Sequence, residues 1–133
     1  MKPLKIVAGI ILNPKRTEVF ITKRHKNVQK TGYWEFPGGK VETRESYQEA
    51  LIRELKEEVG IVVIKLNHFE RSIYKEQGTL FQFDFFLVSL FENEPYGREG
   101  QKGVWIKLSN LKNYRFPKAN ISIIDRISKK NSF

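Results

Sequence analysis

Three glutamates, Glu54, Glu57 and Glu58, are the residues of this 133-residue chain whose type and spacing best suit chemistry. Side chains three or four positions apart lie on one face of a helix, so these carboxylates would lie close together. Like charges at these spacings destabilise a helix by roughly 0.2–0.5 kcal/mol per pair when exposed, and burial adds to that cost. A hard divalent cation such as Mg²⁺ would remove the conflict, because it binds carboxylate and carbonyl oxygens.

The apolar residues of the same helix make a purely solvated acidic face a poor explanation. With about 100° per residue and Ala50 at zero, Glu54 falls near 40° and Glu58 near 80°. Both lie inside the arc that the apolar residues Ala50 and Leu55 define, and Glu57 borders it. A solvated acidic face would point away from this apolar arc.

The limits of the helix follow from its end signals. Ser46 and Glu49 form a capping-box pattern, in which each side chain accepts a hydrogen bond from the other residue's backbone N–H. Gly60 suits the position just past the end of a helix. The sequence therefore predicts a helix over residues 47–59.

A glycine-rich segment, Pro37-Gly38-Gly39, precedes this helix. Two adjacent glycines allow a backbone carbonyl to come close to a metal or a phosphate. A simple turn is the more ordinary interpretation, and we expect the segment to end a short strand at residues 32–36.

Composition excludes several other kinds of site. The chain has no Cys and only two His, so disulfides, thiolate nucleophiles and cysteine–zinc sites are excluded, and any metal must be held by oxygen ligands. No run of about 18 apolar residues is present, and the first five residues show no signal peptide. The net charge is +9, yet residues 39–61 carry six acids and four bases. An acidic block in a basic chain suits a cation that bridges carboxylates to phosphates.

The remaining residues alternate between strand and turn patterns and end in a helix pattern. Residues 120–129 place isoleucines three apart, which suits a terminal amphipathic helix. The runs expected to form strands are 5–12, 18–23, 32–36, 61–64, 68–74, 80–91 and 104–108, with loops at 13–17, 24–26 and 92–103. This order predicts an α/β (α+β) fold, in which a mixed sheet lies between helices, and a single domain over residues 1–133.

Residues 39–61 also match a known motif as a whole. Gly39 is followed by Glu45, by Arg-Glu-Leu-Lys-Glu-Glu at residues 53–58 and by Gly60, at fixed spacing. This pattern resembles a complete Nudix box. The resemblance implies the Nudix fold, with a loop–helix–loop that binds divalent cations and hydrolyses a nucleoside diphosphate linked to another group.

Four further segments resemble the MutT-type 8-oxo-dGTP diphosphatases of that superfamily. They lie at residues 20–24, 35–40, 94–101 and 116–120. The resemblance implies Mg²⁺-dependent hydrolysis of oxidised purine triphosphates to the monophosphate and pyrophosphate, with Mn²⁺ as an alternative metal. Such an activity removes oxidised nucleotides from the nucleotide pool and so prevents mutation in DNA replication and repair. Two places depart from the pattern, since Val104 replaces an acid and residues 75–79 match poorly.

The resemblance implies roles for individual residues of the box and its surroundings. The implied metal ligands are Glu54, Glu57, Glu58, Glu99 and the carbonyl of Gly38. Glu54 is our choice of general base, with Glu99 as the rival. Arg53 would orient the carboxylates by ion pairing, and the alternative is a helix-surface pair with Glu49. Three residues would support the loop and the box, Gly39, Glu45 and Gly60, and the alternative for Glu45 is an outer metal site.

Four residues are candidates for contacts with the nucleotide: Arg24, Phe36, Lys40 and Asn120. The resemblance implies that Asn120 reads the base, since an amide both donates and accepts hydrogen bonds. Asn120 also stands where an N-cap belongs for the last helix, which is the competing interpretation. The alternatives for the others are a solvated basic loop for Arg24, the core for Phe36 and an exposed lysine for Lys40.

Two other kinds of function compete with this one. The first is a Nudix hydrolase for an ordinary nucleotide, a dinucleotide or a capped RNA end, and the second is a non-catalytic nucleotide-binding module. The intact glutamates argue against the module. No helix-turn-helix, zinc-finger or RNA-binding strand motif is visible, so we expect a small nucleotide as partner, with no stable nucleic-acid binding and no membrane binding. We also expect a cytoplasmic monomer.

Overall fold

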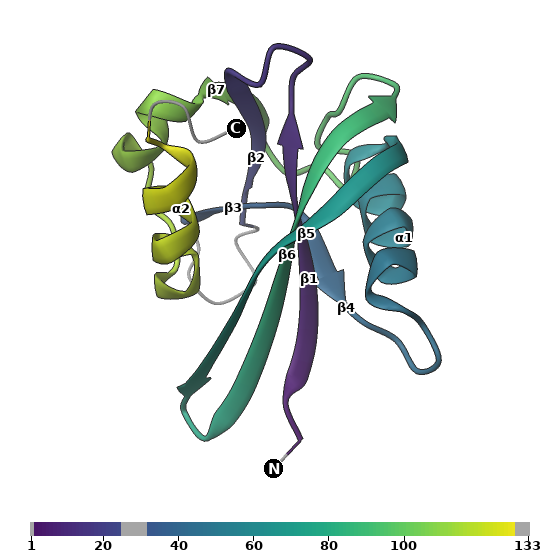
Figure 1. Cartoon of the computed structure of the whole chain (residues 1–133), viewed down its shortest axis with the longest axis vertical. Helices are drawn as coiled ribbons and strands as arrows, with labels where there is room; N and C mark the ends of the chain where they lie inside the picture. The colour runs from purple at the N-terminus through teal and green to yellow at the C-terminus, as the bar shows by residue number, and fades with distance from the viewer. Residues whose placement is uncertain (1, 25–31, 130–133) are drawn as a thin grey trace.

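The computed structural model describes residues 2–24 and 32–129. In this part of the chain, a seven-stranded sheet runs in the order β3-β2-β1-β6-β5, with β4 paired to β1 and β7 paired to β2 (Figure 1). The strands are β1 Leu4–Leu12, β2 Glu18–Lys23, β3 Trp34–Glu35, β4 Gly38–Lys40, β5 Val62–Glu76, β6 Thr79–Glu92 and β7 Gly103–Lys107. The helices are α1 Tyr47–Val59 and α2 Ile121–Ile127, and 3₁₀ turns cover Leu108–Asn113 and Lys118–Asn120.

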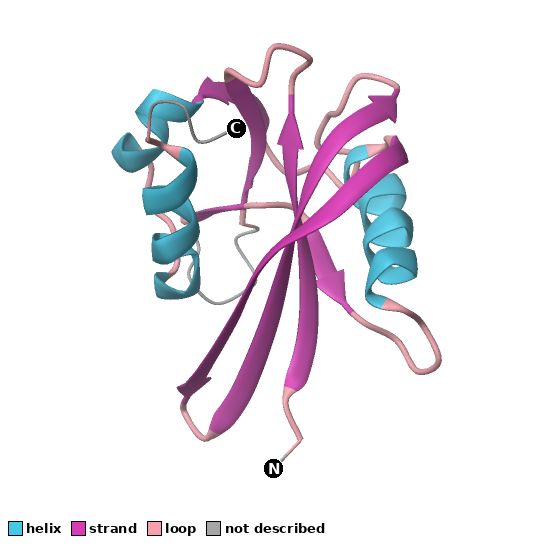
Figure 2. Ribbon diagram, viewed as in Figure 1, coloured by secondary structure: helices cyan, strands magenta, loops and turns pink. Residues whose placement is uncertain are grey.

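The sheet lies between the two helices, as the order of elements predicts (Figure 2). Side chains alternate across strand β1, so Val7 and Ile11 pack with α1 while Ile10 and Leu12 pack with α2. Two buried apolar clusters result, one on each face of the sheet. The expected mixed sheet between helices is therefore confirmed. Within the described residues, neither helix has the length and apolar character needed to cross a bilayer.

Helix α1 covers the predicted residues, Tyr47–Val59. The Ser46 side chain accepts from the Glu49 N–H at 3.0 Å, and the Glu49 carboxylate accepts from the Ser46 N–H at 2.8 Å. Gly60 ends the helix with φ 73°, in the left-handed region that glycine adopts without strain. The predicted capping box and glycine end are both confirmed.

The prediction that Pro37-Gly38-Gly39 forms a turn is wrong. Gly38 and Gly39 lie in β4, which pairs antiparallel with β1 while β1 pairs in parallel with β6. A Cβ on Gly38 would lie 1.9 Å from the carbonyl oxygen of Val7, so no larger residue fits this pairing. The two glycines allow a strand to pass close to β1 directly in front of α1.

Strand β5 corrects a second prediction. The two expected runs, 61–64 and 68–74, fall in one strand, Val62–Glu76, apart from Ile61, which lies just before it. The pairing of this strand with β6 shifts register between Val63 and Leu66 and again between His68 and Glu70. Such irregularities break the alternation of apolar residues on which strand prediction relies. The tight turn that joins β5 to β6 contains Gln77 and Gly78, both at positive φ.

The last helix is shorter than predicted. Helix α2 begins at Ile121 and ends at Ile127, inside the predicted 120–129. Of the basic loop expected at 24–26, only Arg24 is described.

Candidate active site

Arg53 lies at the centre of an ion-pair network at the start of the acidic face of α1. Its Nε and Nη2 donate to the two carboxylate oxygens of Glu45, at 2.6 and 3.0 Å. Its Nη1 donates to Glu54 at 2.8 Å and contacts Glu57 at 3.4 Å, and Nη2 also donates to the Lys40 carbonyl at 3.1 Å. One guanidinium thus links the loop before the helix to two of the helix glutamates.

This arrangement favours the orienting role for Arg53 over the surface pair with Glu49, because the Glu49 carboxylate accepts from the Ser46 N–H. The hydrogen bond from Arg53 lowers the pKa of Glu45, and the same bond raises the pKa of Arg53. Both side chains therefore stay charged, and their two hydrogen bonds join the loop before α1 to the helix.

Glu58 is the most buried carboxyl of the acidic face, with 8% of its surface exposed. Burial raises the pKa of Glu58 to about 9, and the charges of Glu35, Glu54 and Glu99 contribute to the rise. The Gly38 N–H donates to its Oε2 at 3.2 Å, which opposes the shift in part. A buried carboxyl that other acids surround is a costly arrangement without a cation.

Glu54 lies directly behind β4. Burial raises the pKa of Glu54, the hydrogen bond from Arg53 lowers it, and the charges of Glu57 and Glu99 raise it further. A Cβ on Gly39 would lie 2.4 Å from the Glu54 carboxyl carbon, so Gly39 leaves room for this carboxylate. Glu99 itself is exposed on the loop after β6, and its charge contributes to the raised pKa values of Glu54 and Glu58.

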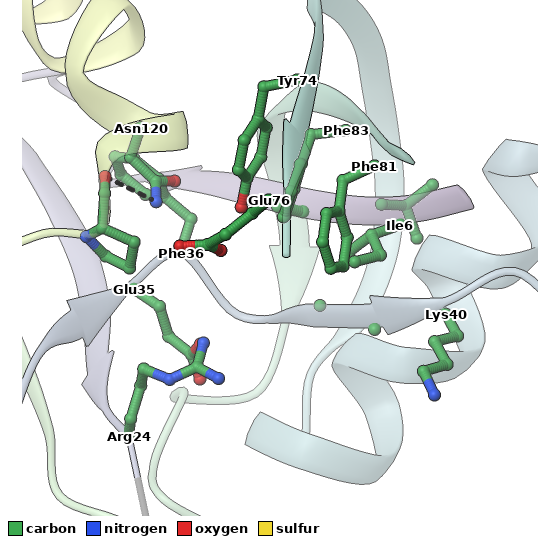
Figure 3. Close-up of a pocket in the computed structure, with 15 residues that line it drawn as sticks. Ile6, Arg24, Glu35, Phe36, Lys40, Tyr74, Glu76, Phe81, Phe83 and Asn120 are labelled. Atoms are coloured by element: carbon green, nitrogen blue, oxygen red, sulfur yellow. Dashed lines mark hydrogen bonds and ion pairs between the residues drawn. The ribbon is translucent and has the colours of Figure 1, made fainter. Parts of the chain in front are cut away.

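A cavity of about 280 Å³ opens in front of β4 (Figure 3). The four residues predicted to contact the nucleotide, Arg24, Phe36, Lys40 and Asn120, all line it, together with Gly38 and Gly39. Arg24 donates to Glu35 at 2.8 Å on the cavity wall. Phe36 is buried and packs against Phe116, with ring centroids 5.3 Å apart, so it belongs both to the core and to the cavity.

Asn120 occupies the N-cap position of α2, as expected, but its side chain does not cap the helix. Its backbone is helical and its side chain makes no cap hydrogen bond. The Asn120 Nδ2 instead donates to the Pro117 carbonyl at 3.4 Å, and only 6% of the residue is exposed. Figure 3 shows the amide beside the space that Glu76 and Tyr74 enter from β5.

Comparison with known proteins decides the family. A family model described as the NUDIX domain matches residues 3–127. The chain belongs to the Nudix family. The resemblance of residues 39–61 to a Nudix box and the expectation of a Nudix fold are thereby confirmed.

Individual Nudix proteins are similar over nearly the whole chain. The 8-oxo-dGTP diphosphatase of Escherichia coli strain K12 is 40% identical over 129 residues, 97% of this chain and 99% of that protein. The CTP pyrophosphohydrolase of the same strain is 30% identical over 94% of this chain and 91% of that protein. A solved structure from a study of MutT from Aliivibrio salmonicida and Vibrio cholerae has a TM-score of 0.85 at 47% identity, covering 96% of this chain and 98% of that chain.

The Nudix box offers oxygen donors that fit a divalent cation. Carboxylates suit Mg²⁺ or Mn²⁺, and the raised pKa values of Glu54 and Glu58 reflect burial together with mutual repulsion that a cation would relieve. Among the described residues, however, no three carboxylate or histidine side chains already form a cluster that could hold a metal. Glu57 contacts Arg53, and Glu99 lies exposed on its loop.

Sequence reasoning missed four residues that line the same cavity of this Nudix protein: Tyr74, Glu76, Phe81 and Phe83. Tyr74 stacks on Phe81 with ring centroids 5.4 Å apart, and Phe81 and Phe83 are 6.3 Å apart. Alternation along residues 80–91 puts these phenylalanines on one face of the strand. That signal could have predicted an aromatic wall, but it could not show what the wall faces.

Proposed function

We propose that this Nudix protein hydrolyses 8-oxo-dGTP and related oxidised purine nucleoside triphosphates to the monophosphate and pyrophosphate. The observation that carries the proposal is one cavity that reaches from Gly39 and Lys40, in front of the acidic helix, to the buried amide of Asn120. A nucleotide in this cavity can place its phosphates at the glutamates and its base at the amide. The similarity to proteins named 8-oxo-dGTP diphosphatase supports the choice of substrate.

The reaction is attack of water on a phosphorus atom, in which charge and positioning make up most of the barrier. A divalent cation, Mg²⁺ or alternatively Mn²⁺, would supply charge neutralisation and acidify the attacking water. The groups that would hold it are Glu54, Glu57, Glu58, Glu99 and the Gly38 carbonyl. Among the described residues these carboxylates do not form a cluster that could hold a metal, so the exposed Glu57 and Glu99 side chains would have to come closer to Glu54 and Glu58.

The chain's own groups supply the rest of the mechanism. Glu54 accepts the proton of the attacking water, with Glu99 as the rival base. A raised pKa suits Glu54 to this role, because proton transfer is most effective when the pKa of the base approaches the working pH. Arg53 holds Glu54 in place through the 2.8 Å contact, and Lys40 contacts the phosphates.

In this proposal the nucleobase of the substrate lies between aromatic and amide groups. Phe36 provides an apolar wall, and Arg24 lines the same end of the cavity beside Glu35. Asn120 reads the N7 and C8 positions, where guanine and 8-oxoguanine differ in hydrogen-bonding groups. We further propose that residues 1–133 form one domain that acts as a cytoplasmic monomer on free nucleotides, without stable nucleic-acid or membrane binding.

A second substrate has one specific observation in its favour. The relative that is 30% identical is named CTP pyrophosphohydrolase, so Nudix chains of this size also act on an ordinary triphosphate. The same phosphate chemistry would then operate with a different base in the cavity.

The test is pyrophosphate release with Mg²⁺ from 8-oxo-dGTP, dGTP and CTP, each at low concentration. We expect a much higher kcat/KM for 8-oxo-dGTP than for the other two. Equal turnover of 8-oxo-dGTP and dGTP would contradict the proposed selectivity, and preference for CTP would favour the second substrate. No release from any of the three would contradict the proposed function altogether.

Replacing Asn120 by alanine is expected to weaken discrimination between 8-oxo-dGTP and dGTP by roughly 10-fold, the value of one hydrogen-bonding group at 1–2 kcal/mol. Asn67→Ala, at an exposed position on β5, is the matched control. Both variants are assayed for kcat/KM on each nucleotide and for thermal unfolding. If Asn120→Ala lowers only the melting temperature and leaves the selectivity ratio intact, the base-reading role is wrong.

A further inference from the structure

The loop that carries Glu99 is fastened to the last turn of α1. The backbone N–H groups of Tyr96 and Arg98 donate to the carbonyls of Val59 and Glu58, at 3.2 and 3.0 Å. The Arg98 guanidinium donates to the Glu57 carbonyl at 3.0 Å. The last four carbonyls of a helix have no partner within the helix. The loop therefore supplies donors to the turn that carries Glu57 and Glu58.

Gln101 adds a side-chain bridge between this turn and Glu99. Its Nε2 donates to the Glu58 carbonyl at 3.1 Å, and its Oε1 accepts from the Glu99 N–H at 2.9 Å. Gln101 is 9% exposed, so water has little access to the bridge. One buried amide thus touches the backbone of two implied metal ligands, Glu58 and Glu99.

The two contacts together match the side chain of glutamine. The Glu58 carbonyl can only accept and the Glu99 N–H can only donate, so the bridge needs a donor and an acceptor on one side chain. Glutamate offers acceptors alone, and its charge would face the Glu58 carbonyl. Methionine has a similar length but forms neither bond well, and asparagine is one methylene shorter. The Glu58 carbonyl keeps the Arg98 N–H as a donor, but each of these changes removes or weakens at least one hydrogen bond of the bridge, so each should loosen the loop.

Gly97 makes the bridge possible by its lack of a side chain. A Cβ on Gly97 would lie 1.6 Å from the Gln101 carbonyl oxygen and 3.4 Å from its Oε1. The loop therefore folds tightly on itself, and the Gly100 N–H donates to the Gly97 carbonyl at 3.0 Å. This tight closure brings Gln101 back beneath Glu99.

We propose that Gln101 is a positioning residue that fixes the Glu99 loop against α1, so that the Glu99 carboxylate is held near Glu54 and Glu58. Gln101 acts through its hydrogen bonds to the backbone and does not touch substrate. The proposal rests on the proposed function, because it takes Glu99 as a group that acts at the cation site. The fastening of the loop can nevertheless be tested without any turnover.

Two substitutions at Gln101 test the two hydrogen bonds of the bridge. Gln101→Glu removes the donor to Glu58 and keeps an acceptor for Glu99, whereas Gln101→Met removes both. The matched control is Gln48→Glu, which makes the same change of charge at an exposed position in the first turn of α1. Each variant is measured for hydrogen exchange of the Glu99 amide without metal, for kcat and KM on 8-oxo-dGTP, and for the Mg²⁺ concentration that gives half-maximal rate.

We expect Gln101→Met to abolish protection of the Glu99 amide. Both Gln101 variants should lower kcat, or raise the Mg²⁺ requirement, by roughly 10- to 100-fold, as for residues that orient metal ligands. The nucleotide KM should stay within about twofold, because Gln101 does not line the cavity. The control should match the wild type in every measurement. A general loss of folding would not produce this separation of KM from the Mg²⁺ requirement.

Two results would overturn the proposal: unchanged exchange of the Glu99 amide in Gln101→Met, or an unchanged kcat and Mg²⁺ requirement in both variants of an active enzyme. If Gln101→Glu does not fold, the uncharged methionine variant decides alone. A wild type without Mg²⁺-dependent turnover would instead contradict the proposed function, and the exchange data would still decide whether Gln101 fastens the loop.

Discussion

Replacing Glu54 by glutamine is expected to lower turnover of 8-oxo-dGTP by about 10³-fold while the fold is retained. Glutamine has the same shape, and its oxygen can still accept from Arg53, where the carboxylate now accepts at 2.8 Å. It cannot take a proton from the attacking water. The measurement is initial pyrophosphate release at saturating Mg²⁺, with circular dichroism to verify the fold.

A comparison with Glu99→Gln separates the two candidates for the general base. The variant that lacks the general base should lose the acidic limb of the pH–rate profile. A variant that only weakens cation binding should regain its rate at high Mg²⁺. Glu92→Gln, on an exposed position at the end of β6, controls for loss of one negative charge. A Glu54→Gln enzyme with nearly wild-type rates would remove Glu54 from the mechanism.

The second large effect concerns stability rather than turnover. We expect Glu58→Gln to raise the melting temperature of the metal-free protein at pH 8 by about 10 °C. Burial raises the pKa of Glu58 to about 9 in the folded protein, whereas the unfolded chain has the ordinary value of 4.5. At pH 8 this difference in pKa lowers the free energy of unfolding, because the unfolded chain is stabilised by ionising Glu58. Glutamine is neutral in both states and avoids this loss.

The sign of the pH dependence follows from proton binding. Below pH 4.5 both states hold the proton, and Glu58 does not oppose folding. Between pH 4.5 and about 9 the unfolded chain releases its proton while the folded protein keeps it, so stability falls as pH rises. Each pH unit in this window costs at most about 1.4 kcal/mol, and a domain of this size loses roughly 3–5 °C per kcal/mol.

Melting temperatures in EDTA at pH 5 and pH 8 test this expectation. The difference between variant and wild type should be small at pH 5 and large at pH 8. Added Mg²⁺ should stabilise the wild type more than Glu58→Gln, because a cation favours the ionised carboxylate. An equal difference at both pH values would show that Glu58 is ionised in the folded protein without metal.

Local signals predicted the part of the site that lies on α1. The capping box at Ser46 and the glycine at residue 60 act within a few positions, so the helix bounds could be predicted without knowledge of the sheet. Helix geometry alone also places Glu58 within the apolar arc. The Glu58 side chain is buried, as this placement indicates.

The parts that depend on distant pairing could not be predicted in the same way. Gly38 and Gly39 have the local character of a turn, but their conformation follows from pairing with Val7 and Ala8 on β1. Gln101 reaches Glu58 only because its loop folds back onto α1. Asn120 stands where a cap residue is expected, yet the turn at Lys118–Asn120 already gives it a helical backbone, and its amide bonds back to Pro117 instead.

Strand β1 also bears on the order in which the molecule forms. Its parallel pairing joins Leu4 to Phe81 and Ile11 to Val88, so the centre of the sheet cannot close until β6 exists. Such distant pairing is slow, because the entropy of closing the intervening chain is lost before any contact compensates. During synthesis, α1 emerges well before Val88, which packs in the apolar cluster beneath it. In that interval the nascent chain exposes the apolar side of α1. We therefore expect the chain to be most prone to aggregation and proteolysis at this stage.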